Sequence, residues 1–175
     1  MSELFRTEMT VDEVLIYIDQ HSDQRFDFTD GELVEVSPKP IHGYIQSQLT
    51  ALLVNWSKQN KVGYVHTEVL HVLDGNKFIP DISVNAQTAH NQSHFDTPPL
   101  VAVEIRSDTQ SRASQQRKAQ EYIRRNTPTV MLIFPNEGIE LYTKEEIRSY
   151  KLGQTVRDIL GLDGLLIDVD DVLVS

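Results

Sequence analysis

The spacing of apolar residues predicts three helices along the chain. Thr10 and Glu13 form a capping-box pattern, and the apolar positions after Thr10 recur at helical spacing, which predicts a helix over residues 10–18. A broad apolar stripe predicts a second, longer helix over residues 41–59. A third helix is predicted over residues 112–125.

Strands are predicted where apolar residues alternate or run together between turn residues. Apolar positions alternate on both sides of the turn pair Asp30 and Gly31, which predicts a β-hairpin over residues 25–36. Residues 85–99 are polar and are expected to form a loop. The remaining predicted strands, the last two of them forming a small tail, cover residues 62–73, 78–84, 100–106, 129–134, 139–143 and 146–152.

The order of these elements predicts the fold class. Several strands in succession, followed by a helix and a further strand, indicate an α/β or α+β fold with a mixed β-sheet flanked by helices. The N-terminal helix and hairpin would extend this core. With 175 residues, of which 39% are hydrophobic, the chain is long enough for a single domain that spans residues 1–175.

Composition narrows the range of functions. The chain has no cysteine, which excludes disulfides and thiolate metal sites. It shows no signal-peptide pattern and no apolar run of membrane-spanning length, so we expect a cytoplasmic location and no membrane partner. The net charge of −10 disfavours non-specific binding to nucleic acid. However, residues 112–125 carry five basic residues against one acidic residue, so this helix presents either a solvated face or a nucleic-acid contact.

Two acidic residues occupy positions where strands are usually apolar. Asp81 lies within FIPDISV, and Glu104 lies within VAVEIRS. On neighbouring strands the two carboxylates can share a face, and such a pair suits Mg²⁺, which prefers oxygen ligands. A bound metal would offset their repulsion and could polarise a phosphate or activate a water. Alternatively, Asp81 caps a strand end and Glu104 pairs with Arg106, which shares its face.

Several short motifs occur together in a fixed order. They are FDFTDGELVEVSP at residues 26–38, a histidine at the start of the long helix, PD at residues 80–81, VExxS at residues 103–107 and KxxxY at residues 118–122. In order and spacing the chain resembles the Uma-type restriction endonucleases, a family within the PD-(D/E)XK nuclease superfamily. The resemblance runs from the N-terminal helix to the ending LDGLLIDVDDVL.

The resemblance implies a restriction-endonuclease-like fold and a metal-dependent phosphodiesterase. Asp81 and Glu104 would bind Mg²⁺ or Mn²⁺, and Asp27, which replaces the family's usual glutamate, would complete the ligand set. The superfamily's lysine lies two residues after the glutamate, where this chain has Arg106. Because arginine stays protonated, it can stabilise a phosphate but cannot act as a base. Lys118, on the following helix, is the alternative source of a catalytic cation.

Four further residues are candidates for contact with substrate. His42 either orients substrate and water or is only a polar residue at a helix start. Tyr122 lies one helical turn after Lys118, so it either shares the site or packs against the sheet. Ser107, from the VExxS motif, and Arg117, from the basic helix, complete this set.

We therefore expect a metal-dependent DNA endonuclease, with a homodimer as one way to cut both strands. Two alternatives remain open, since a fold does not fix chemistry. The domain is either a catalytically silent relative that binds a protein partner or a metal-dependent hydrolase with another substrate.

His66 and His71, at odd spacing in one predicted strand, are expected to face opposite sides. Residues 168–171 are expected to form a solvated acidic tail.

Overall fold

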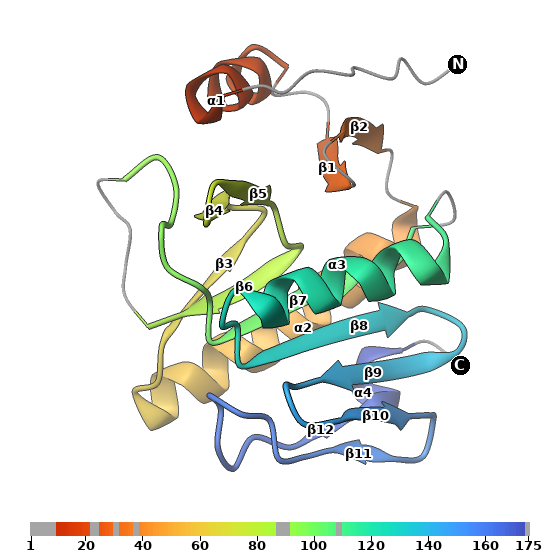
Figure 1. The fold of residues 1–175 in the computed structure, drawn as a ribbon. Coiled ribbons are helices and arrows are strands. Elements are labelled where there is room, and N and C mark those ends of the chain that lie inside the picture. The colour runs from red at the N-terminus through yellow and green to blue at the C-terminus, as the bar shows by residue number, and fades with distance from the viewer. Residues whose placement is uncertain are drawn as a thin grey trace.

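The computed structural model describes residues 10–21, 25–29, 32–36, 39–86, 92–107 and 110–173, with residues 25–29 and 32–36 described at the level of the backbone (Figure 1). No helix of this part of the chain is long and apolar enough to cross a membrane. The helices are α1 (Val11–Gln20), α2 (Pro40–Asn60), α3 (Arg112–Arg124) and α4 (Val169–Val172). The strands are β1 (Arg25–Thr29), β2 (Glu32–Val36), β3 (Tyr64–Thr67), β4 (His71–Leu73), β5 (Asn76–Phe78), β6 (Ile82–Asn85), β7 (Val101–Ile105), β8 (Thr129–Phe134), β9 (Gly138–Tyr142), β10 (Ile147–Tyr150), β11 (Thr155–Val156) and β12 (Ile167–Asp168).

A six-stranded mixed sheet forms the centre of the fold. Its strand order is β10-β9-β8-β7-β6-β3. β7 and β8 are parallel and are joined by the crossover helix α3, whereas the other neighbouring pairs are antiparallel. The mixed sheet with flanking helices that the sequence predicts is confirmed.

The two faces of the sheet are covered by different helices (Figure 1). Alternate residues of β7 point to opposite faces, as strand geometry requires. Val101, Val103 and Ile105 pack in the apolar cluster that contains the buried face of α2. Ala102 packs instead with residues of α3, among them Tyr122. Glu104 has the same parity as Ala102, so this carboxylate is directed to the α3 side.

The long helix and the N-terminal hairpin match their predictions. The apolar stripe gives α2, whose first residue is a proline, a residue well suited to a helix start. β1 and β2 pair antiparallel as the predicted N-terminal hairpin, although its turn at residues 30–31 lies outside the described residues. Asp74 and Gly75 both have positive φ, 48° and 76°, and connect β4 to β5 in a tight turn.

Two predicted strands are each divided in the structure. The strand predicted over residues 62–73 breaks at Glu68, which has a φ of 56° and so cannot continue a β-ladder. The strand predicted over residues 78–84 breaks at Pro80 and Asp81, because proline lacks the amide hydrogen that a ladder needs. The two breaks lie together, since the Glu68 amide donates to the Pro80 carbonyl at 3.2 Å. The predicted β tail is also corrected: β9 and β10 complete the main sheet.

Two smaller expectations are wrong. Residues 168–171 do not form a solvated tail, because Val169 and Val172 of α4 are buried in the core and only the aspartates are exposed. His66 and His71 do not face opposite sides, because they lie in different strands and both contact Asn85. His71 is fully buried, and this burial lowers the pKa of its imidazole and favours the neutral ring.

Candidate active site

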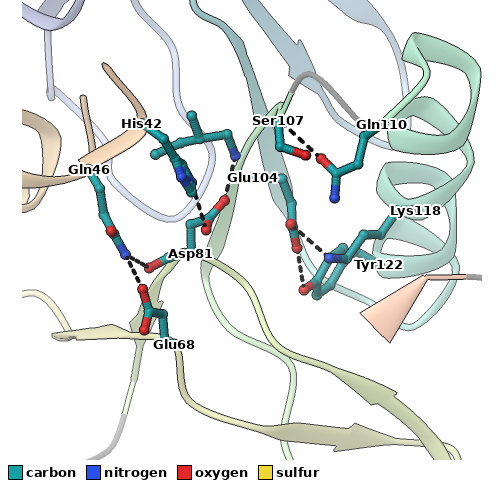
Figure 2. A network of polar contacts seen from close by, with 10 residues as sticks. His42, Gln46, Glu68, Asp81, Glu104, Ser107, Gln110, Lys118 and Tyr122 are labelled. Carbon is teal, nitrogen blue, oxygen red and sulfur yellow. Dashed lines mark hydrogen bonds and ion pairs between the residues drawn. The ribbon is translucent and has the colours of Figure 1, made fainter. Parts of the chain in front are cut away.

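Asp81 and Glu104 lie opposite each other at the end of two neighbouring strands. In the antiparallel pairing of β6 with β7, Ile82 is opposite Val103. Extending this register by one residue places Asp81 opposite Glu104. The sheet therefore places the two acids next to each other on neighbouring strands, but Asp81 contacts residues of α2 and Glu104 contacts residues of α3, so the two carboxylates are held toward different helices (Figure 2).

The Glu104 carboxylate is buried against α3. One oxygen, Oε2, accepts a hydrogen bond from the Lys118 ammonium at 2.8 Å, and the other, Oε1, accepts one from the Tyr122 hydroxyl at 2.9 Å. Glu104, Lys118 and Tyr122 are only 3%, 6% and 0% exposed. Lys118 and Tyr122 are four residues apart, so one face of α3 presents both donors to the same carboxylate.

This ion pair explains how a carboxylate is tolerated inside the sheet. A buried charge is costly unless a partner compensates it and its hydrogen bonds are satisfied. Both conditions are met here by Lys118 and Tyr122. The alternative in which Glu104 pairs with Arg106 is wrong, because the Arg106 guanidinium lies 3.1 Å from Glu137 and is placed over the Phe134 ring.

The Asp81 carboxylate connects the sheet to α2. Its Oδ2 accepts a hydrogen bond from the backbone amide of Ile105 at 2.6 Å. Its Oδ1 lies 3.1 Å from Nε2 of His42, which is the third residue of α2 and is buried (Figure 2). The start of α2 therefore places His42 beside Asp81. This position is compatible with the first of the two roles considered for it, that of a residue in the active site.

Sequence analysis missed Gln46 and Glu68, which also belong to this group. The buried Gln46 amide donates to the Asp81 backbone carbonyl at 3.0 Å and to Glu68 Oε1 at 3.1 Å. Only helical spacing could have pointed to Gln46 in the sequence: it follows His42 by one helical turn and so lies on the same face of the helix. Two residues of α2 therefore hold Asp81, one near its side chain and one at its backbone.

We expect Gln46→Met to lower the free energy of unfolding by about 1–3 kcal/mol, because it removes two hydrogen bonds of about 0.5–1.5 kcal/mol each while keeping a similar volume. Urea denaturation followed by circular dichroism measures this change. The matched control is Gln48→Met on the exposed face of the same helix, which should stay within about 0.5 kcal/mol of the original protein. Equal effects of the two substitutions would show that the contacts of Gln46 with Asp81 and Glu68 do not stabilise the protein.

The remaining candidates are less closely grouped. The Ser107 backbone amide donates to Gln110 Oε1 at 3.1 Å, just after β7. Arg117 lies on the exposed side of α3. The side chain of Asp27, in β1, lies outside what the structure describes. Within the described residues, no group of three or more histidine, cysteine, aspartate or glutamate side chains is placed to hold a metal ion.

A second polar network fixes the start of α3 to the sheet. The Arg112 guanidinium pairs with Glu137 and Glu140 and lies 4.1 Å from the centre of the Phe134 ring. Burial tends to raise the pKa of Glu140, but hydrogen bonds from Arg112, Tyr142 and Gln116 outweigh it and hold this pKa below its ordinary value. Arg124 and Arg125 pair with Glu121. Much of the positive charge predicted for this helix is therefore neutralised within the protein.

Comparison with known proteins agrees with this architecture. The family model Uma2, described as "Putative restriction endonuclease", matches residues 11–170. Among solved structures, the chain is similar to a protein from Anabaena variabilis described as a putative nuclease belonging to DUF820. That likeness has a TM-score of 0.78 at 19% sequence identity and covers 94% of this chain and 97% of the other. At this identity it concerns the fold. No curated protein matches.

Proposed function

Because this chain belongs to the Uma2 family of restriction-endonuclease-like proteins, we propose that it is a metal-dependent endonuclease that hydrolyses phosphodiester bonds in DNA. One observation carries the proposal. Asp81 directly precedes β6 and accepts a hydrogen bond from the backbone of β7, Glu104 lies in β7, and Lys118 is bonded directly to Glu104. Two carboxylates on neighbouring strands of a rigid sheet, with a cation bonded to one of them, are suited to phosphoryl chemistry.

The donor set fits a divalent cation such as Mg²⁺ or Mn²⁺. Carboxylate oxygens are the ligands these ions prefer, and Mg²⁺ commonly takes only one or two carboxylates and fills its other positions with water and phosphate oxygens. Asp81 and Glu104 would supply the carboxylates, and Asp27 remains the candidate third ligand. When bound, such an ion would polarise the phosphate and lower the pKa of a water.

The side chains around the two carboxylates have separate roles in this proposal. Lys118 would place its ammonium beside the phosphate, where negative charge develops during hydrolysis. Tyr122 would hold the second oxygen of Glu104 and so fix the orientation of that carboxylate. His42, next to Asp81, is the group that can accept a proton from the attacking water. Arg106, held by Glu137, would contact a more distant phosphate.

A catalytically silent domain that binds a protein is the second candidate function. One observation favours it: Lys118 and Tyr122 already satisfy both oxygens of Glu104, so this carboxylate can be stable without a metal. The net charge of −10 is also better suited to a protein partner than to DNA.

Incubation of supercoiled plasmid with Mg²⁺ or Mn²⁺ separates the two candidates. We expect nicked or linear DNA with either ion and intact plasmid when EDTA removes the metal. Linear product formed early would support a homodimer, since two sites then act on one duplex. Intact plasmid under all conditions, together with no heat of metal binding by calorimetry, would favour the silent domain, and undiminished cleavage in EDTA would contradict metal dependence.

A further inference from the structure

We propose that a cleft between the end of α2 and the start of β3 binds an unpaired nucleotide segment of a nucleic acid. This inference rests on the proposed function, because it assigns the chain a second contact with the same substrate. The cleft has a volume of about 730 Å³ and lies at the opposite end of α2 from His42. The residues that form it and carry the argument are Ser57, Lys58, Lys61, Gly63, Tyr64 and Val65.

The cleft carries positive charge that the protein does not neutralise. Lys58 and Lys61 are both exposed, and within the described residues neither has a carboxylate partner. Many cations elsewhere are engaged: those that pair with a carboxylate include Arg106, Arg112, Lys118, Arg124, Arg125 and Arg148. In a protein with a net charge of −10, two uncompensated lysines beside one cleft mark a place for an anion.

A buried hydroxyl in the cleft lacks a partner. Ser57 is only 5% exposed, and its Oγ makes no hydrogen bond within the described part of the chain. Buried polar groups in folded proteins are normally satisfied, so an exception that lines a cleft needs an explanation. The Ser57 Oγ is covered in this arrangement, so rotation of its side chain toward the cleft would let a phosphate oxygen or a sugar hydroxyl between the two lysines supply the missing partner.

An exposed aromatic ring completes the chemistry of a nucleotide site. Tyr64, in the edge strand β3, is 51% exposed, although a large aromatic side chain is usually more buried. The aliphatic part of the cleft, including Val65, lies beside it. A base that stacks on an aromatic ring while lysines hold the backbone is the usual mode of single-strand binding.

The position of the cleft allows one strand to reach both sites. Tyr64 is paired with Asn85 at one end of β6, and Asp81 directly precedes the other end. At about 3.3 Å per residue, the four steps from Asp81 to Asn85 span about 13 Å. Along α2, the 15 residues from His42 to Ser57 span about 22 Å at about 1.5 Å per residue, so the two sites are about four to seven nucleotides apart at the rise of about 3.4 Å found in stacked DNA. The cleft would therefore hold a segment that flanks the scissile phosphate.

Fluorescence anisotropy with a labelled single-stranded oligothymidylate tests the proposal. The titration is done in EDTA, so it does not depend on cleavage or on metal binding. We expect the Lys58→Glu/Lys61→Glu protein to bind at least about tenfold more weakly, with a salt slope reduced by about 1.4 for two lost phosphate contacts. The matched control is Lys144→Glu/Lys151→Glu, which makes the same change in net charge at exposed lysines elsewhere.

The aromatic contact is tested separately. Tyr64→Ser should weaken binding at least about fivefold, whereas Tyr64→Phe should keep most of the affinity because the ring remains. Equal affinities of the lysine variant and its charge control, or no binding by the original protein, would overturn the proposal. Neither result would bear on plasmid cleavage, so failure of the cleft and failure of the nuclease proposal are distinguishable.

Discussion

Asp81→Asn is expected to abolish metal-dependent plasmid cleavage, with a loss of at least about a hundredfold. Loss of a residue that only supports a metal ligand already costs about 10- to 100-fold, so loss of a proposed ligand should cost more. The asparagine keeps an oxygen that can accept the Ile105 amide, so the β6–β7 end should remain formed. The measurement is the initial rate of plasmid nicking in Mg²⁺ or Mn²⁺.

The matched control for this variant is Asp163→Asn, an exposed position distant in sequence from the site. It makes the same change in charge and should leave the nicking rate unchanged. Circular dichroism should show the same melting transition for both variants. Cleavage that persists in Asp81→Asn at the rate of the original protein would exclude the proposed site, even if the protein proves to be a nuclease.

Lys118→Met is expected to lower the free energy of unfolding by about 3–5 kcal/mol, because it leaves Glu104 buried without its cation. Urea denaturation at neutral pH measures the effect. Arg124→Met is the matched control on the same helix. The ion pair of Arg124 is exposed and should contribute no more than about 1 kcal/mol.

Mg²⁺ then distinguishes a metal ligand from a purely structural ion pair. If Glu104 binds the metal, added Mg²⁺ should stabilise the Lys118→Met protein more than the original, because ligand binding to the folded state adds stability. The double variant Glu104→Gln/Lys118→Met should regain part of the lost stability and should not respond to Mg²⁺. A response to Mg²⁺ that is the same in all three proteins would place metal binding elsewhere.

The parts of the fold that sequence analysis predicted are those fixed by local pattern. The apolar stripe of residues 41–59 determines α2 because burial of one face repeats at helical spacing. The breaks at Glu68 and Pro80 were missed, since both strands were drawn through polar residues on the strength of the apolar residues on either side. Pro80 is a signal that the sequence carries, because proline interrupts a ladder. Glu68 adopts a positive φ through tertiary contacts, and its carboxylate is held by Gln46 from another element. The break at Glu68, unlike the one at Pro80, has no local signature.

The candidate site shows the same division. The opposition of Asp81 and Glu104 follows from strand order, and the shared face of Lys118 and Tyr122 follows from helical spacing. Strand parity also placed Arg106 on the face of Glu104. Strand parity did not predict that Arg106 would form its ion pair with Glu137, from the turn between β8 and β9, instead of with Glu104. Whether Arg106 pairs with Glu104 or with Glu137 depends on distances that only the folded chain defines.

The hydrogen bond from the Ile105 amide to Asp81 makes this carboxylate the last rung of the β6–β7 ladder. In a continued ladder the Ile105 amide would donate to a backbone carbonyl of the next strand, but here it donates to the Asp81 side chain. The position of Asp81 is therefore fixed by the backbone of the neighbouring strand. The backbone of the central sheet thus holds this acid in place directly, so the site does not depend on a separate loop to orient Asp81.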